Sequence, residues 1–305
     1  MVAILRKFID FVQLPAKTAC IFPFFLSLFY ALAVYRHGNV TNTLIFFLSM
    51  LAFELSVTGL NSYIDTKTNG MELQFPRKTA KHILEGLLAF AVILALFLVF
   101  RAGLVVLILG GLCFLVGILY SYGPAPISRM PLGEVFSGIF EGFFIPFLVV
   151  YLNSPENSLI GYSFRGWVVQ ITLNLSSIFR LFILCIPAML GIANIMLANN
   201  ICDVEADIRV KRYTLPYYLG VQNSLRLFAA NYYMAFFAVI LTAVFRILPF
   251  YILAALLPFG LIQKNISRFQ KLQSKTKTFP YSVKNFTFLM VSMIVVTGIA
   301  AFLHS

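Results

Sequence analysis

At the end of a long apolar run the chain reads Asn199-Asn200-Ile201-Cys202-Asp203-Val204-Glu205-Ala206-Asp207. An earlier apolar run ends in a related stretch, Asn61-Ser62-Tyr63-Ile64-Asp65-Thr66-Lys67-Thr68-Asn69. In both stretches an Asp follows the first Asn by four residues, and an Asn or Asp follows that Asp by another four. This spacing places the polar side chains on one face of a helix. Because both runs are long enough to cross a bilayer, the sequence predicts two membrane helices whose polar ends face one cavity.

The composition of the whole chain is typical of a membrane protein. Of its 305 residues, 60% are hydrophobic and only 11% are charged, whereas soluble domains carry about 25% charged residues. The chain has too few polar groups to cover a soluble surface, so we expect the lipid bilayer to be its solvent. The net charge of +12 does not indicate a nucleic-acid partner, because the basic residues fall in short gaps between apolar runs. In such gaps they favour membrane topology and phospholipid contact.

The apolar runs predict an all-α membrane protein with nine transmembrane helices around a central cavity. Each run has close to the roughly 20 residues that a helix needs to cross the hydrocarbon core. Backbone groups in lipid must form their hydrogen bonds within the segment, so these runs are helices and not strands. The predicted spans cover residues 18–35, 43–63, 83–100, 102–120, 132–151, 181–200, 227–245, 247–263 and 286–304.

We expect residues 1–305 to form a single domain. A polar motif ends the second predicted helix in each of two segments, about 1–125 and 126–265, and this position suggests that the segments are related halves. The segment 152–180, which holds the single Trp, Trp167, is predicted to be a loop with an interfacial stretch.

The distribution of Lys and Arg predicts the orientation of the helices. If the N-terminus faces the cytoplasm, only five of the 23 Lys and Arg residues fall in outer segments, namely Arg36, Arg101, Arg165, Arg180 and Arg246. The other 18 fall in inner segments, as the positive-inside rule requires. The sequence therefore predicts a multi-pass protein of the cell membrane with both motifs on the cytoplasmic side, a cytoplasmic N-terminus and an extracytoplasmic C-terminus.

The carboxylates of the two motifs are candidate metal ligands. Mg²⁺ prefers a few carboxylates together with phosphate oxygens and water, and three carboxylates from two helices suit a clamp for Mg²⁺ and a diphosphate. The candidate ligands are Asp65, Asp203 and Asp207, with Asn61 and Asn69 on the face of the first motif. Solvated loop residues would explain a single motif of this kind, but two motifs on one membrane side favour a site. A transporter with paired polar helix ends is an alternative.

Basic and amide side chains near the motifs are candidate diphosphate ligands, because they neutralise or hydrogen-bond phosphate oxygens. They are Lys17, Lys67, Arg129, Asn199, Asn200, Arg209 and Lys211. Arg77, Lys78 and Arg212 also follow the motifs and add positive charge there. Lys17 stands at the mouth of the first span, where it is either a topology anchor or a phosphate ligand.

Two further features provide candidates for the cavity wall. The turn from Tyr120 through Tyr122 to Arg129 contains Gly and Pro. It is either a rigid element that places Tyr120 or Tyr122 in the cavity or a plain interhelical loop. Glu54 and Glu141 lie within apolar spans, where a carboxylate is costly unless it faces a cavity or a partner. Both are therefore functional candidates, with helix-to-helix hydrogen bonding as the alternative.

Four blocks of sequence give the chain a specific resemblance to a known family. The blocks are Asn61–Asp65, Tyr120–Glu134, Asn199–Asp207 and Lys211–Gly220. They resemble the UbiA-type superfamily of intramembrane aromatic prenyltransferases. Within it, the chain is most similar to the 1,4-dihydroxy-2-naphthoate polyprenyltransferases of menaquinone biosynthesis.

The chain departs from the pattern of that superfamily at three positions. Ser62 stands where an Asp follows the first Asn, Asn69 occupies the later acidic position of the first motif, and Cys202 stands where an Arg often precedes the first Asp of the second motif. The first motif is therefore short of carboxylates in comparison with the family.

The resemblance implies a reaction and roles for the candidate residues. Mg²⁺ held by Asp65, Asp203 and Asp207 would bind the diphosphate of a polyprenyl donor. Tyr120 and Tyr122 would shield the allylic cation that forms when the diphosphate leaves. A naphthoate acceptor would attack this cation and lose carbon dioxide, giving demethylmenaquinol. Two alternatives remain open: prenyl transfer to another aromatic acid, and a carrier or transporter of polyprenyl or quinone lipids without catalysis.

Overall fold

The computed structural model describes residues 2–67 and 72–303 of the chain. Within these residues, nine helical spans are long and apolar enough to cross a membrane, which confirms the predicted fold class. The spans are η1 (Leu14–Lys17) with α2 (Thr18–Tyr35), α3 (Val40–Asp65), α4 (Arg77–Ala102), α5 (Leu104–Ser121), α6 (Gly133–Ile139) with η3 (Phe140–Phe144) and α7 (Ile145–Leu152), α8 (Leu175–Arg209), α10 (Val221–Val244), η4 (Phe250–Leu256) with α11 (Phe259–Lys271), and α12 (Pro280–Leu303). The remaining elements are α1 (Val2–Phe11), η2 (Ile127–Arg129), β1 (Ile160–Arg165), β2 (Val168–Leu173) and α9 (Leu215–Leu219).

The predicted spans agree with these helices except at their ends. The clearest difference is in α8, which runs from Leu175 to Arg209, whereas the apolar pattern predicts only residues 181–200. Hydropathy detects the part of a helix that lies in the hydrocarbon core, and α8 continues as a regular helix through its polar motif. Asp203 and Asp207 therefore lie one turn apart on a rigid helix, as their spacing predicts.

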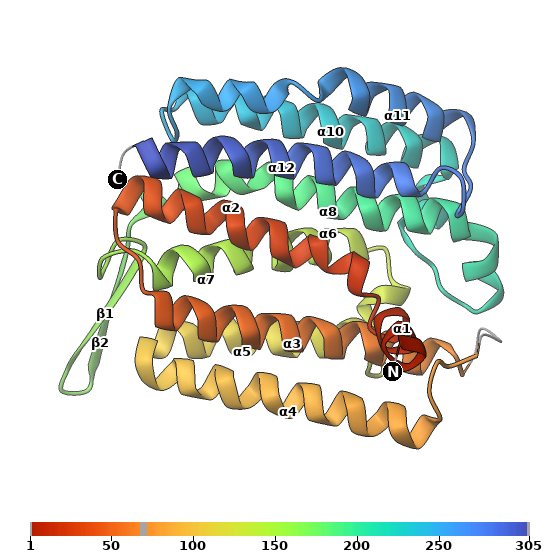
Figure 1. The fold of residues 1–305 in the computed structure, drawn as a ribbon, viewed down its shortest axis with the longest axis horizontal. Coiled ribbons are helices and arrows are strands. Elements are labelled where there is room, and N and C mark those ends of the chain that lie inside the picture. Colours follow the sequence, from red (N-terminus) through yellow and green to blue (C-terminus); the bar gives the residue numbers. More distant parts are fainter. Residues whose placement is uncertain (1, 68–71, 304–305) are drawn as a thin grey trace.

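The spans pack into two groups (Figure 1). The first group contains α2, the fifth span (α6, η3 and α7), α8, α10, η4 with α11, and α12, and its apolar side chains supply most of the largest buried core. The second group contains α3, α4 and α5, which pack mainly against one another below the first group in Figure 1. α3 makes few contacts with α2 and α7, so the two groups pack against each other less closely than the helices within each group.

The outer helices of the second group face lipid. In α4 and in α5, only 17% of the most apolar 18-residue segment is buried inside the protein. In α8, 61% of the corresponding segment is buried. Large apolar side chains such as Phe97, Phe100 and Leu115 are exposed on α4 and α5. A bilayer removes these surfaces from water, so their exposure is consistent with a membrane protein.

The segment between α7 and α8 contains a β-hairpin that the sequence analysis does not predict. β1 pairs antiparallel with β2, with Arg165 opposite Val168, so Gly166 and Trp167 form a two-residue turn. Gly166 has a φ of 61°, the left-handed value that the first central residue of a type II′ turn requires. β2 is exposed along its whole length, so it lacks the alternation of buried and exposed residues that identifies most strands. Trp167 is fully exposed at the tip.

The fifth span packs unusually closely against α8. η3 in the middle of this span is a π-helical turn, an element that occurs often at functional sites. A Cβ atom at Gly142 would lie 2.6 Å from Cα and 2.7 Å from N of Met189 on α8, and a Cβ at Gly138 would lie 2.7 Å from the carbonyl oxygen of Met189. Glycine is therefore needed at both positions for the two backbones to approach each other.

We predict that Gly142→Ala destabilises the protein by about 1–3 kcal/mol, because the added methyl group meets backbone atoms that cannot move without shifting α8. Gly86→Ala on α4 is a matched control, since a Cβ there has nothing within 4 Å and Ala favours a helix over Gly. Thermal unfolding of both variants in one detergent tests this. Equal melting temperatures for the two variants would contradict the packing described here.

Candidate functional site

A cavity of about 1040 Å³ lies between the two helix groups. Nine of the candidate residues named from the sequence line it: Lys17, Glu54, Asn61, Asp65, Tyr120, Glu141, Asn199, Asn200 and Asp203. The cavity is polar where α3 and α8 end and largely apolar along α4, α5 and α7. We call the polar end of the cavity, where α3 and α8 end, its mouth. The site thus combines a charged mouth with an apolar interior.

A helix-ending turn brings a basic residue back to the second motif. The backbone N–H of Arg212 donates to the carbonyl of Asp207 at 2.8 Å, and that of Lys211 donates to the carbonyl of Ile208 at 3.1 Å. These two bonds define a Schellman motif. Lys211 adopts the left-handed φ of 57° that the motif requires, a value that Gly would adopt with less strain. The turn places Arg212 beside Asp207 although Arg212 lies beyond the end of α8.

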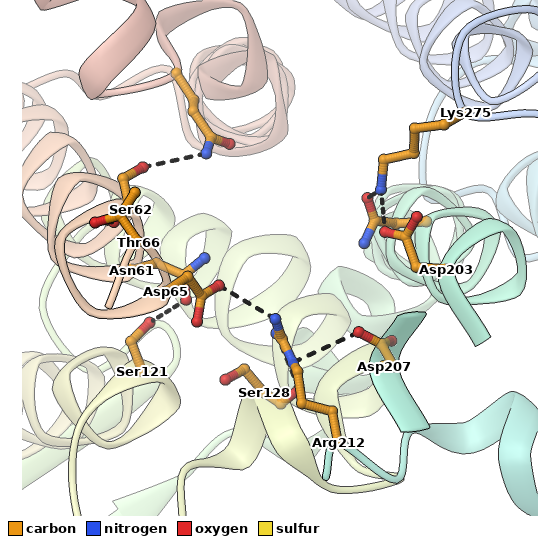
Figure 2. A network of polar contacts seen from close by, with 12 residues as sticks. Asn61, Ser62, Asp65, Thr66, Ser121, Ser128, Asp203, Asp207, Arg212 and Lys275 are labelled. Carbon is orange, nitrogen blue, oxygen red and sulfur yellow. Dashed lines mark hydrogen bonds and ion pairs between the residues drawn. The ribbon is translucent and has the colours of Figure 1, made fainter. Parts of the chain in front are cut away.

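Arg212 connects the two motifs across the cavity mouth (Figure 2). Its Nη1 atom lies 3.2 Å from Oδ2 of Asp65 on α3, and its Nε atom lies 3.8 Å from Oδ1 of Asp207 on α8. Its Nη2 atom donates to the backbone carbonyl of Ser128 at 3.5 Å. The Nε atom is buried and has no hydrogen-bond partner among the described residues. One guanidinium therefore holds together carboxylates from the two helix groups.

Lys275 makes the corresponding contact with the first Asp of the second motif. Its ammonium group donates to Oδ1 of Asn199 and to Oδ2 of Asp203. Lys275 lies in the loop between α11 and α12, so a third segment of the chain reaches the mouth of the cavity. Each of the three motif carboxylates thus has a basic partner.

The first part of the first motif, Asn61–Asp65, forms the end of α3. Asn61 and Asp65 both line the cavity, as their spacing predicts. Asn61 accepts a hydrogen bond from the hydroxyl of Ser121 at the end of α5, at 3.2 Å. Ser62 accepts one from the side-chain amide of Gln13 at 3.4 Å, so the residue that replaces a carboxylate ties α3 to the segment after α1.

The other predicted residues lie around the mouth and not in the cavity wall. Within the described residues, the cavity lining does not include Lys67, Tyr122, Arg129, Asp207, Arg209 or Lys211. Lys67, Arg209 and Lys211 are exposed at the ends of α3 and α8, and Asp207 is 8% exposed and reaches the mouth through Arg212. Tyr122 points out of the cavity region with most of its side chain exposed. Asn69 lies outside the described residues.

A buried hydrogen bond orients one of the motif amides. The Nδ2 atom of Asn200 donates to Oε1 of Glu134 on α6 at 2.8 Å. Glu134 is 4% exposed, and its second carboxylate oxygen has no hydrogen-bond partner among the described residues. The bond fixes the side chain of Asn200, which lines the cavity.

The chemistry of the mouth fits a hard divalent cation. Carboxylates of Asp65, Asp203 and Asp207 and the amide oxygens of Asn61 and Asn199 are the oxygen donors that Mg²⁺ prefers, and Mg²⁺ takes the rest of its ligands from phosphate and water. Within the described residues, no three His, Cys, Asp or Glu side chains are grouped closely enough to hold a metal by themselves. Arg212 lies between two of the carboxylates instead, so the same place already favours positive charge.

Two residues of this mouth are not among those chosen from the sequence. From the sequence, Arg212 is only one of several basic residues after the second motif. Its position just beyond the predicted helix end is the one local feature that could have identified it. Lys275 has no local signal, because its partners Asn199 and Asp203 lie more than 70 positions earlier. Only the folded chain reveals that these two side chains, and not the neighbouring Arg209 and Lys211, contact the motif carboxylates.

Comparisons with known proteins agree with this architecture. A UbiA homologue from Archaeoglobus fulgidus bound to GPP and Mg²⁺ has a TM-score of 0.66 with this chain at 11% identity, over 97% of this chain and 99% of that chain. A UbiA homologue from Aeropyrum pernix K1 has a TM-score of 0.61 at 14% identity, over 92% and 97% of the two chains. These likenesses concern the fold alone.

A sequence relative adds a partial match. The chain is 30% identical over 125 residues to the 1,4-dihydroxy-2-naphthoate octaprenyltransferase of Bacillus subtilis (strain 168), and the matched segment covers 41% of this chain and 34% of that relative. The match to a family model is much longer, because residues 20–291 fit the UbiA prenyltransferase family. The part of the chain that the structure describes forms nine spans around a cavity with Asn61, Asp65, Asn199 and Asp203 at its mouth, and the chain belongs to the UbiA prenyltransferase family.

Proposed function

We propose that the protein transfers a polyprenyl group from a polyprenyl diphosphate to 1,4-dihydroxy-2-naphthoate. The acceptor loses carbon dioxide, and the products are demethylmenaquinol and diphosphate. The observation that carries this proposal is the convergence of both motifs on one charged mouth above an apolar cavity. The family membership and the partial match to a naphthoate octaprenyltransferase support the same reaction.

In this proposal the mouth binds the diphosphate as a magnesium complex. Asp65, Asp203 and Asp207 would hold Mg²⁺ with help from Asn61, and bound Mg²⁺ would stabilise the negative charge of the departing diphosphate. Arg212 and Lys275 would turn from the carboxylates to the phosphate oxygens, where charge-assisted hydrogen bonds are strong. Lys67, Arg209 and Lys211 are exposed beside the mouth and would attract the donor.

The apolar part of the cavity then receives the prenyl chain. The wall formed by α4, α5 and α7 is apolar like a hydrocarbon tail, so the transfer of the tail from water to this wall has a favourable free energy. Tyr120 lies between this wall and the mouth and would face the allylic carbon. A site that excludes water also protects the allylic cation from hydrolysis. The protein would act in the cell membrane, with the mouth and the N-terminus on the cytoplasmic side.

Two other functions use the same geometry. The acceptor can be a different aromatic acid, because the motifs contact only the donor in this proposal. The replacement of a carboxylate by Ser62 favours a second alternative, a carrier of polyprenyl or quinone lipids that binds without catalysis.

Purified protein in detergent provides the decisive assay. We expect 1,4-dihydroxy-2-naphthoate, a radiolabelled polyprenyl diphosphate and Mg²⁺ to give labelled demethylmenaquinol, and we expect EDTA to abolish the product. Competition with 4-hydroxybenzoate in the same detergent assay tests the acceptor. Donor binding without product from either acid would contradict the enzyme and support the carrier.

A further inference from the structure

A second polar cluster lies deeper in the cavity and has no role in the reaction steps above. It consists of Lys17, Glu54 and Glu141, all of which line the cavity. Glu54 and Asp65 lie on the same face of α3, 11 residues apart, which corresponds to about 16 Å along the helix axis. The cluster is therefore separated from the mouth by enough length for the reacting end of a donor and an aromatic ring.

Lys17 is fixed by two hydrogen bonds to Glu54 and keeps one N–H donor for a ligand. Its side chain is 3% exposed, and its ammonium group donates to the backbone carbonyl of Glu54 at 2.8 Å and to the carboxylate of Glu54 at 3.4 Å. An ammonium group has three N–H donors, so these two bonds leave one for a ligand. Lys17 comes from the junction of η1 and α2, which brings a cation to the cavity wall.

Glu141 is the member of the cluster that the protein leaves without a direct partner. It lies in the π turn η3 and lines the cavity. Among the described residues it forms no hydrogen bond or ion pair, although Glu54 and Lys17 are close enough to interact with it electrostatically. A carboxylate at membrane depth is costly without a partner, and a ligand that donates a hydrogen bond would supply one.

Tyr120 links the cluster to the mouth. Its hydroxyl accepts a hydrogen bond from Ser137 on α6 at 3.5 Å. It interacts electrostatically both with Glu141 and with Arg212. A ring placed beside Tyr120 would thus have Glu141 on its deep side and the diphosphate mouth on the other.

We propose that Lys17, Glu54 and Glu141 form the acceptor subsite and select an aromatic acid whose hydroxyl group is adjacent to its carboxylate. The free N–H of Lys17 binds the carboxylate, Glu141 accepts a hydrogen bond from the neighbouring hydroxyl, and Glu54 positions Lys17. This inference rests on the proposed function and adds the acceptor class to it. An acid with its hydroxyl at the far end of the ring, such as 4-hydroxybenzoate, cannot satisfy both groups at once.

Glu141 also takes the hydroxyl proton when the ring attacks. The C–O bond of the donor breaks with its electron pair on the diphosphate, and a ring π pair forms the new C–C bond at the carbon that bears the carboxylate, from which carbon dioxide is then lost. The O–H bond breaks at the same time: its electron pair becomes the π bond of a ring carbonyl, and its proton goes to the carboxylate of Glu141. General-base catalysis of this kind contributes about 10²–10⁴-fold in rate.

A purely structural role explains only part of the cluster. The pair of Lys17 and Glu54 joins η1 to α3 and would stabilise helix packing by itself. Glu141 comes from a different span and takes no part in that pair. The proposal is therefore tested most sharply at Glu141.

The first measurement is equilibrium binding of three probes to the full-length protein in one detergent. They are 1-hydroxy-2-naphthoate, 1-methoxy-2-naphthoate and 1-naphthol. Wild type should prefer the first over each of the others by about tenfold, since a hydrogen bond to a charged group contributes about 1.5–3 kcal/mol. Glu141→Met should remove the preference for hydroxyl over methoxy, and Lys17→Met should remove the preference for the carboxylate. Glu85→Met, on the exposed face of α4, should keep both preferences.

The second measurement separates binding from proton transfer. Glu141→Gln keeps a hydrogen-bond acceptor but does not take a proton, so it should recover acceptor binding and leave the transfer rate about a hundredfold below wild type. Binding of farnesyl diphosphate with Mg²⁺ should be unchanged in every variant, which also shows that the variants are folded.

The possible results distinguish this inference from the proposed function. Unaltered probe preferences in Glu141→Met, or loss of donor binding together with acceptor binding, would overturn the subsite. If wild type shows the preferences but makes no product from any naphthoate, the subsite stands and the proposed reaction fails.

Discussion

Asp203→Asn should lower the rate of prenyl transfer by about a thousandfold, which corresponds to about 4 kcal/mol in transition-state stabilisation. Asp203 lines the cavity and pairs with Lys275, so the neutral amide removes both a charged metal ligand and the group that holds Lys275. Asp207→Asn should have a comparable effect, because Asp207 and Asp65 share Arg212. Asn69→Ala should cost far less, since an amide contributes less than a carboxylate to a magnesium site.

Initial rates at saturating donor and acceptor, measured over a range of Mg²⁺ concentrations, test this prediction. Glu205→Gln is the matched control, because Glu205 lies on the same turns of α8 with its side chain exposed. It should retain nearly full activity. Comparable activity in the Asp203, Asp207 and Asn69 variants would contradict the assignment of the mouth as a metal and diphosphate site.

Arg212→Gln should have the second large effect. It should lower both the melting temperature without magnesium and the rate of prenyl transfer. Without ligand, the change leaves the carboxylates of Asp65 and Asp207 without their shared cation, and breaking a partly buried ion pair is destabilising. The melting temperature in EDTA should therefore fall, and Mg²⁺ should restore it at a lower concentration than wild type needs for its own stabilisation. The transfer rate should fall about a hundredfold, because a charge-assisted contact to the diphosphate is lost.

Arg226→Gln on the exposed face of α10 controls for the general loss of a positive charge. It should leave both the melting temperature and the magnesium response unchanged. A variant at Arg212 that melts like wild type in EDTA, and shows the same magnesium response, would show that the bridge between the motifs has no energetic importance.

The sequence was sufficient for the spans and for the helix faces of the motifs. Apolar runs report burial in lipid directly, and the four-residue spacing of Asn61 and Asp65, or of Asn199 and Asp203, depends only on helix geometry. Lys275 could not be predicted in the same way, because its contact with Asp203 depends on how α11 and α12 pack beside α8. Such contacts between distant segments are set by tertiary packing and leave no local pattern.

Two other features show where local rules are insufficient. Arg209 and Arg212 are both basic residues near the second motif. Arg212 reaches the motifs and Arg209 does not, because the left-handed turn at Lys211 directs the chain back toward Asp207. The sequence predicts a loop where β1 and β2 form a hairpin, because neither strand alternates buried and exposed residues along its length. In both cases a backbone conformation at one residue, Lys211 or Gly166, determines the result.

The position of Trp167 determines what intrinsic fluorescence can report. It is the single tryptophan of the chain and lies at the tip of the hairpin, which joins α8 at the end opposite the motifs (Figure 1). Asn199 lies 24 residues after Leu175 at the start of α8, so that end is about 36 Å from the nearest residue of the second motif. Emission from Trp167 will therefore respond to quenchers carried by the lipid headgroups beside the hairpin. It will not change when a ligand enters the cavity. A tryptophan introduced near the mouth would be needed to follow ligand binding optically.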